Sequence, residues 1–359
     1  MINVTKTFLP PQDEYQAILN RAWETGWITN RGVLVKELEN KLKKYLNVNH
    51  VVAMTNGTLP LQIAIKVLGL KGEIITTPFS YVATTSSIVW EGCKPIFVDI
   101  HPEYLTIDET KIEAAITPDT SAILATHVFG NPCHIEAIDA IAKKHHLKVI
   151  YDAAHCFGVT YKGQSIFNYG DVSTCSFHAT KLFHTGEGGA LFTNSKALYD
   201  KAYYHHNFGH LGEEAFQGLG INAKMSELQA AMGLAVFPYL NAIIEERKSI
   251  FIFYQEAFKM HNISSLSLRP ETVWNYGYYP IIFETEEVLL RVKKALNEAQ
   301  IFPRRYFFPN LGKLNYVKSN MGNIPISQKV SKTILCLPFY SGLGELNIKR
   351  IKEIVLSEL

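Results

Sequence analysis

Two residues near the middle of the chain, Lys181 and Asp152, carry reactive groups in a setting that suggests chemistry. Asp152 ends the run 148–152, which predicts a buried strand that delivers a carboxylate to the edge of a sheet. Lys181 follows another strand-like run, 171–177, and precedes the glycine-rich segment 186–189. A lysine amine condenses with an aldehyde to a Schiff base, and a carboxylate facing a pyridine nitrogen keeps that ring protonated as an electron sink. The pair therefore predicts a site for pyridoxal 5'-phosphate.

Residues that follow other strand-like runs offer further groups to the same sheet edge. Gly57 and Thr58 lie where a strand gives way to a helix, so the glycine permits close backbone approach and the threonine is expected to cap the helix. Free amides at such a helix start can hold a phosphate. Tyr81 follows the next strand and can stack on a flat ring. Ser176 and His178, just before the lysine, can add a phosphate ligand and a polar neighbour.

Each of these residues also has an ordinary structural interpretation. The turn at Gly57 is compatible with a plain strand-to-helix connection, and Tyr81 can be a core tyrosine. Asp152 can cap a helix or join a structural ion pair, and most lysines are solvated. The prediction of a cofactor site therefore depends on all of these residues together.

Composition and motifs exclude several other classes of protein. The 359 residues are 47% hydrophobic and 19% charged, and 35 basic against 33 acidic residues give a net charge of +2, which predicts no nucleic-acid partner. The glycines at 186–189 form neither a Walker A motif nor a dinucleotide fingerprint. His206 and His210 lack a third ligand, so no metal site is expected.

The N-terminus and the cysteines indicate a soluble cytoplasmic protein. No signal peptide is evident, and no run approaches the roughly 20 apolar residues of a membrane helix. The cysteines form no C-x-x-C pair, and their odd number within apolar runs favours reduced core thiols over a disulfide framework. They are Cys93, Cys133, Cys156, Cys175 and Cys336.

Between about residues 34 and 205, strand-like runs alternate with helical patterns. This alternation predicts an α/β fold with a mostly parallel sheet covered on both faces. A helical pattern then continues to about residue 260, interrupted near Pro238, and a less regular segment contains a strand candidate at 276–283 and a helix candidate at 286–299. We expect a large domain over 1–240 and a smaller C-terminal α/β domain over 241–359. The predicted strands of the sheet are 51–54, 74–76, 95–99, 122–126, 148–152, 171–177 and 190–193.

Several motifs run in order over nearly the whole chain. They are Asn56-Gly-Thr58, Asp152-Ala-Ala-His155, Ser176-Phe-His-Ala-Thr-Lys181 with Gly186-Glu-Gly-Gly189, and Asn222-Ala-Lys-Met-Ser-Glu-Leu-Gln-Ala-Ala-Met-Gly-Leu234. Together they resemble the DegT/DnrJ/EryC1/StrS family of nucleotide-sugar aminotransferases. The resemblance implies fold type I of the pyridoxal phosphate-dependent transferases, like aspartate aminotransferase. In that fold a large domain with a seven-stranded, mostly parallel sheet joins a small C-terminal domain, and a homodimer forms active sites at its interface.

The resemblance also implies roles around the cofactor ring. Lys181 is expected to form the Schiff base with pyridoxal phosphate, and pyridoxamine phosphate is expected as the intermediate form. Asp152 is expected to bind the pyridine nitrogen. Tyr81 would stack on the ring, and His155 would lie near its hydroxyl side.

At the cofactor phosphate, the resemblance implies contacts from Gly57, Thr58 and Ser176, with His178 nearby. Asn222 would reach the phosphate from the neighbouring subunit of the homodimer. Many family members have Asn-Tyr-Arg-Met where this chain has Asn222-Ala-Lys-Met225, so it lacks an arginine there.

The substrates implied by the resemblance are glutamate and a sugar nucleotide in a ping-pong reaction. The stretch 179–184 resembles the branch that aminates carbon 4 of dTDP-4-keto-6-deoxyglucose, and the family points to the synthesis of cell-surface polysaccharides such as O-antigen. Guanidinium groups bind phosphate oxygens in pairs, so arginines are candidates to bind the diphosphate of the sugar nucleotide. The candidates are Arg31 and the arginines of the stretch 304–306, and for each of them a solvated surface role stays open. The predicted substrate contacts are Thr29, Arg31, His184, Arg305 and Tyr306.

Three alternatives stay open at this point. The enzyme could aminate carbon 3 of a 3-keto sugar nucleotide instead. A sugar dehydratase of the same fold would have a histidine in place of the lysine, which Lys181 argues against. A non-catalytic sensor that binds the cofactor is the alternative from another class, and the intact lysine, aspartate and serine positions argue against it.

Overall fold

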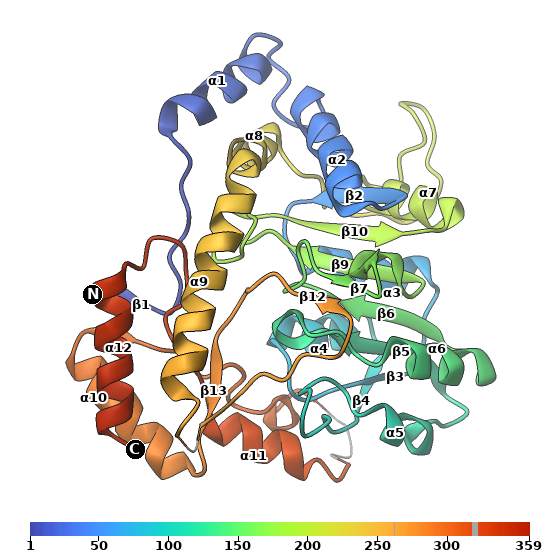
Figure 1. Ribbon diagram of the computed structural model, residues 1–359. Coiled ribbons are helices and arrows are strands. Elements are labelled where there is room, and N and C mark those ends of the chain that lie inside the picture. The colour runs from blue at the N-terminus through green and yellow to red at the C-terminus, as the bar shows by residue number, and fades with distance from the viewer. Residues whose placement is uncertain (262, 318–321) are drawn as a thin grey trace.

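The computed structural model describes residues 1–261, 263–317 and 322–359, and its centre is a seven-stranded sheet (Figure 1). All the strands run parallel except β10, which is antiparallel to both of its neighbours. The predicted strands are all present, with ends that differ by a few residues at most. In spatial order they are β2 (His50–Met54), β10 (Gly189–Thr193), β9 (Val172–Ser176), β6 (Lys148–Asp152), β5 (Thr120–Thr126), β3 (Glu73–Thr76) and β4 (Lys94–Phe97).

Both faces of the sheet are buried, because successive side chains of each strand enter different hydrophobic cores. In β5, Ala122 and Leu124 pack in one core, while Ile123 and Ala125 pack in the other. The first core lies under α3 (Leu59–Val67), α4 (Val82–Trp90) and α7 (Lys196–His205). The other lies under α2 (Val33–Leu46), α6 (Ile135–Lys144) and α8 (Glu227–Val236).

Helix α2 shows how the sequence specifies this packing. Its leucines repeat every four residues, at 34, 38, 42 and 46, and all of them are buried. The helix ends at Asn47, whose φ of 47° is the left-handed conformation that asparagine adopts at helix ends.

The C-terminal part of the chain builds a separate hydrophobic core. The helical stretch predicted to be interrupted near Pro238 consists of α8, a short 3-10 turn at Phe237–Tyr239 and α9 (Leu240–Phe258). This separate core, called the second core from here on, packs α9 against α10 (Glu286–Glu298), α12 (Glu345–Ser357) and a three-stranded sheet. That sheet joins β11 (Ser264–Ser265), β13 (Pro280–Ile282) and β15 (Ile334–Cys336). The division into domains near residue 240 stays a prediction.

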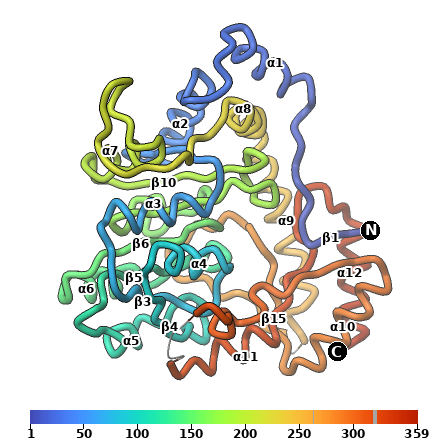
Figure 2. Tube along the Cα trace, turned by 180° about the vertical axis from the view of Figure 1, so that it is seen from behind, coloured from blue at the N-terminus to red at the C-terminus, as the bar shows by residue number. Residues whose placement is uncertain are grey.

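Both chain termini lie beside α10 and α12, which contribute to this second core, as Figures 1 and 2 show from opposite sides. Strand β1 (Ile2–Asn3) pairs with β14 (Ile301–Phe302), and Ile2 is buried in the core. The other described α-helices and strands are α1 (Gln12–Trp23), α5 (Glu109–Ile112), α11 (Pro325–Thr333) and a small sheet of β12 (Thr272–Val273), β7 (Thr160–Tyr161) and β8 (Gln164–Ser165).

Within the described ranges, one helical stretch, Glu227–Phe258, is long and apolar enough to cross a membrane by length and composition. Half of an apolar window in this stretch is buried inside the protein, and the core helices of soluble proteins can meet the same two criteria. The cysteines are all buried and unpaired, as predicted.

Candidate active site

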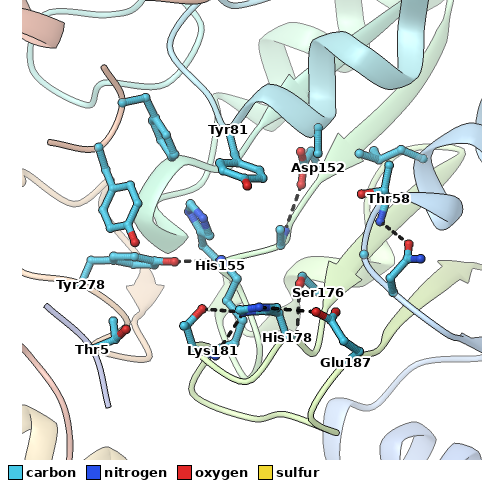
Figure 3. Close-up of a pocket in the computed structure, with 18 of the residues that line it drawn as sticks. Thr5, Thr58, Tyr81, Asp152, His155, Ser176, His178, Lys181, Glu187 and Tyr278 are labelled. Carbon is cyan, nitrogen blue, oxygen red and sulfur yellow. Dashed lines mark hydrogen bonds and ion pairs between the residues drawn. The ribbon is translucent and has the colours of Figure 1, made fainter. Parts of the chain in front are cut away.

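A cavity of about 380 Å³ opens where the carboxyl ends of β2, β3, β6 and β9 meet (Figure 3). This edge is where open α/β sheets bind ligands. The predicted site residues that line the cavity are Gly57, Thr58, Tyr81, Asp152, His155, Ser176, His178, Lys181 and Tyr306. The structure therefore brings together residues from five separate stretches of the sequence.

Asp152 ends β6, is only 5% exposed and faces the cavity. Its carboxylate accepts a hydrogen bond of 2.6 Å from the Thr84 hydroxyl and one of 3.2 Å from the amide of Ala154. Burial raises the pKa of the Asp152 carboxyl, and these two donors act in the opposite direction. It forms no ion pair within the part of the chain that the structure describes. Since a buried carboxylate is costly without a cation, this site suits a cationic ligand.

The Thr84 hydroxyl belongs to a buried chain of hydroxyl groups. Ser80 Oγ lies 2.7 Å from Thr84 Oγ1 and 3.0 Å from Thr126 Oγ1. Ser80 follows β3, Thr84 lies in the first turn of α4 and Thr126 ends β5. Three elements therefore fix the hydroxyl that holds the Asp152 carboxylate.

We expect Thr84→Val to raise the dissociation constant of pyridoxal phosphate roughly 10-fold, because a hydrogen bond to a charged group is lost without a change in shape. Loss of this donor also raises the Asp152 pKa further. Thr85→Val is the matched control, since the Thr85 hydroxyl is buried and has no hydrogen-bond partner among the described residues. Fluorescence titration of both variants measures the effect. Equal affinities for the two variants would show that the Thr84 hydroxyl has no such role.

Lys181 lies in the loop between β9 and β10, and its amine enters the same cavity. Its Nζ donates a hydrogen bond of 2.9 Å to the Tyr278 hydroxyl. Burial lowers the pKa of the Lys181 amine, although Tyr306 and Asp152 act in the opposite direction. A lowered pKa favours the neutral amine, which is the form that attacks a carbonyl carbon.

The turn after β2 has the close packing expected of a phosphate cradle. A Cβ at Gly57 would lie 2.7 Å from Ser176 Cβ, so only glycine fits between the two loops. The predicted cap from Thr58 is wrong, because the Asn56 side chain caps α3 and accepts hydrogen bonds of 2.9 Å from the amides of Thr58 and Leu59. Thr58 already has helical φ and ψ angles, whereas a capping residue is typically extended. Its hydroxyl makes no capping bond and lines the cavity.

Aromatic groups line the opposite side of the cavity (Figure 3). The Tyr81 ring faces the cavity and is 53% exposed, which leaves a flat surface for stacking. His155 Nδ1 accepts a hydrogen bond from the amide of Phe129, 3.1 Å away. Burial, and the nearby Lys181 amine, hold the pKa of His155 well below its usual value, so the imidazole is neutral.

Two predicted arginine contacts lie outside this cavity. Arg31 pairs with the buried Glu39 at 2.7 Å. Arg305 pairs with Glu286 at 2.7 Å, and its side chain is only 10% exposed. Its neighbour Arg304 lines the cavity instead. The backbone is extended here, because Arg304 pairs with Cys336 of β15. Successive side chains on an extended backbone point to opposite sides, so Arg304 faces the cavity and Arg305 does not.

The other predicted residues that lie outside the cavity of this one chain are Thr29, His184 and Asn222. Thr29 is exposed in the segment after α1. His184 is buried, and its Nε2 lies 2.6 Å from the Phe8 carbonyl oxygen. Asn222 accepts a hydrogen bond of 2.8 Å from Lys224, in a loop beyond the cavity.

Several cavity residues are not among those predicted from the sequence. Tyr278 and Phe307 come from the C-terminal part, Thr5 comes from the N-terminal segment, and Glu187 sits within the glycine-rich loop. The last of these was open to prediction, because the loop was already assigned to the site. Glu187 Oε1 lies 3.5 Å from His178 Nε2.

Comparisons with known proteins show the family of this chain. The model of the DegT/DnrJ/EryC1/StrS aminotransferase family matches residues 11–356. The dTDP-4-amino-4,6-dideoxy-D-glucose transaminase of Shigella dysenteriae is 40% identical over 98% of this chain and 99% of that protein. The Escherichia coli transaminase of the same name is 36% identical over 100% of this chain and 99% of that protein. The solved structure of DesI with its TDP-sugar product is 29% identical, with a TM-score of 0.93 over 99% of this chain and 92% of that chain.

Proposed function

Since the chain belongs to the DegT/DnrJ/EryC1/StrS aminotransferase family, we propose that it transfers an amino group from glutamate to carbon 4 of dTDP-4-keto-6-deoxy-D-glucose. The observation that carries the proposal is the placement of Lys181 and Asp152, an amine and a carboxylate that enter one cavity from neighbouring strand ends. The names of the two transaminases that are similar over the full chain support carbon 4.

The cavity fits pyridoxal 5'-phosphate. Asp152 has no cationic partner in the part of the chain that the structure describes, and a protonated ring nitrogen would supply one. Tyr81 offers its face to the ring, and His155 lies beside the lysine amine. The phosphate would lie at the start of α3, held by Gly57, Thr58 and Ser176 with His178 nearby. When bound, the cofactor supplies an aldehyde for the amine and a ring that accepts electrons.

Lys181 carries out both chemical tasks of the protein. Its side-chain nitrogen would hold the cofactor covalently until an amino donor displaces it. The freed amine would then take the proton from the α-carbon of the donor as a general base and would return it as a general acid. In the half-reaction with the keto sugar, the same amine would move a proton in the opposite direction, onto the sugar carbon that receives the nitrogen. Each half-reaction therefore needs the amine in its neutral form, which burial favours.

The test is incubation of the purified protein with glutamate and a panel of keto-sugar nucleotides, followed by NMR of the product. We expect amination of carbon 4 of dTDP-4-keto-6-deoxy-D-glucose. Amination of carbon 3 of a 3-keto sugar would favour the first alternative. Loss of water from the sugar without transfer of nitrogen would indicate a dehydratase, and no conversion of the bound cofactor by any donor would indicate a sensor.

Arg304 is our candidate for the diphosphate of the sugar nucleotide, since it is the arginine that lines the cavity among the described residues. We expect Arg304→Gln to raise the Michaelis constant for the sugar nucleotide roughly 10- to 100-fold, because a hydrogen bond between two charged groups is lost. The Michaelis constant for glutamate should stay within about 2-fold. Arg350→Gln, on the exposed face of α12, is the control. Steady-state kinetics measure both Michaelis constants. An unchanged Michaelis constant for the sugar nucleotide would show that Arg304 does not bind its diphosphate.

We also propose a homodimer, because Asn222 lies outside the cavity of its own chain. The loop between α7 and α8 projects from the body of the protein in both views (Figures 1 and 2) and ends near Asn222. Its exposed apolar side chains favour burial against a second copy. They are Phe208, Leu211, Phe216, Leu219 and Ile221. In the proposed dimer Asn222 reaches the partner's cofactor phosphate.

We also propose a cytoplasmic location, which the reduced cysteines fit.

A further inference from the structure

The Tyr278 hydroxyl contacts the reactive atom of the site, the Nζ of Lys181, at 2.9 Å (Figure 3). We propose that Tyr278 is a further catalytic residue, whose hydroxyl orients the Lys181 amine each time that amine is free. The proposal rests on the proposed function, in which the amine is released and recaptured in every turnover. The C-terminal part of the chain, which carries Tyr278, would then contribute directly to the reaction at Lys181.

The loop that carries Tyr278 is fixed to the sheet edge by its neighbours. The side-chain nitrogen of Asn275, Nδ2, donates hydrogen bonds of 2.9 Å to the carbonyl oxygens of His155 and Phe157. The Asn275 side-chain oxygen accepts a hydrogen bond of 3.1 Å from the amide of Gly277. Asn275 therefore ties the loop to the segment that follows Asp152 on β6.

Trp274, the residue before Asn275, fixes the loop at a second point. Its indole nitrogen donates a hydrogen bond of 2.8 Å to the carbonyl oxygen of Phe129. The Tyr278 ring itself packs against the rings of His155 and Phe129, with centroids 4.6 and 5.4 Å away. The position of the Tyr278 hydroxyl is therefore set by packing and by hydrogen bonds, as orientation of a reacting group requires.

A buried arginine holds the same loop from the other side. Arg247, on α9, is 4% exposed and donates hydrogen bonds to the carbonyl oxygens of Tyr276 and Gly277, at 3.3 and 3.1 Å. It forms no ion pair with any residue that the structure describes, and burial lowers its pKa to about 10, so it still carries its charge at neutral pH. A buried charge is costly, and here the two carbonyl groups of the loop and the face of the Phe339 ring, 5.7 Å from the guanidinium, offset that cost.

The geometry explains what a neutral hydroxyl can do here. Burial raises the pKa of Tyr278, so the phenol stays protonated and places no negative charge beside Lys181. A free amine rotates about its Cε–Nζ bond, and one N–H donated to Tyr278 stops that rotation. The lone pair and the remaining hydrogens then point in fixed directions, which benefits both attack on a carbonyl and proton transfer.

We expect Tyr278→Phe, which removes only the hydroxyl, to slow both half-reactions on the order of 10- to 100-fold without changing either Michaelis constant more than about 2-fold. Both halves suffer because the same amine acts in each. Tyr279→Phe is the matched control, since this neighbouring tyrosine is buried in the second core and lies outside the cavity. Stopped-flow absorbance of the bound cofactor, with glutamate and then with the keto sugar, measures each half. Rates within about 2-fold of the wild type would overturn the proposal, as would an effect confined to one half.

A second measurement on the cofactor-free protein needs no activity. Acylation of Lys181 at a series of pH values, followed by mass spectrometry, reports the pKa of its amine. The Tyr278 hydroxyl accepts from the amine and so stabilises its charged form, and Tyr278→Phe should lower this pKa, whereas Tyr279→Phe should not. An unchanged labelling profile would overturn the contact. If no amino donor converts the cofactor of the wild-type protein, the proposed function fails, while this profile still decides whether Tyr278 holds the amine.

Discussion

Replacing Lys181 with alanine is expected to abolish turnover, with a loss of at least roughly 10⁴-fold, because one amine serves as covalent anchor and as acid–base group. The variant should still bind pyridoxal phosphate, since Asp152 and the cradle at Gly57 are unchanged. The absorbance spectrum and steady-state assays check both parts. A small external amine should restore a fraction of the activity, because the space left by the side chain opens into the cavity.

The control for this variant is Lys294→Ala, because Lys294 lies on α10 with 77% of its side chain exposed. Its turnover should equal that of the wild type. Full activity of Lys181→Ala would contradict the assignment of the amine. Complete loss of cofactor from that variant would contradict the proposed contacts of Asp152 and the phosphate cradle.

The second large effect is expected from Asp152→Asn, which keeps the shape of the side chain and removes its charge. We expect turnover to fall on the order of 10³-fold, because the ring nitrogen loses the partner that keeps it protonated. The cofactor-free variant should be at least as stable as the wild type at pH 7. Burial raises the Asp152 pKa above its ordinary 3.8, so the stability that this group contributes is greatest below pH 3.8 and is lost as the pH rises through the folded-state pKa. Asparagine has no charge to bury at any pH.

Asp99 offers a matched comparison, because it is also buried and follows a strand of the same sheet. Its carboxylate accepts hydrogen bonds from the amides of Ile326 and Ser327 at the start of α11. We expect Asp99→Asn to lower the thermal midpoint, since an acceptor is lost at the helix start. The thermal midpoints and the turnover numbers of the two variants separate a structural acid from a functional one. A lower midpoint for Asp152→Asn in the cofactor-free protein would contradict the functional assignment.

Much of the fold follows from the sequence because its signals are local. Apolar runs of the length of a strand, separated by helical patterns, identify β5 and β6 and their neighbours. The family, the fold class and the aminotransferase activity expected from the resemblance are confirmed. Asp152 and Lys181 could be placed in one site because the ends of parallel strands meet at one sheet edge.

The remaining site residues depend on contacts that no local pattern encodes. Tyr278 reaches Lys181 only because Asn275 and Arg247 fix its loop against distant parts of the chain. Arg304 and Arg305 are adjacent and chemically identical, and only the pairing of this segment with β15 decides which one faces the cavity. A sequence pattern gives the residue types but not the side to which they point.

The most direct test of the account is to find where the cofactor is attached. The purified protein, loaded with pyridoxal phosphate, is treated with borohydride to make any link to a lysine permanent, and its peptides are analysed by mass spectrometry. We predict the pyridoxyl group on Lys181, and no such group when glutamate has first converted the cofactor to its amine form. Attachment to another lysine, or none in the untreated protein, would contradict the central claim.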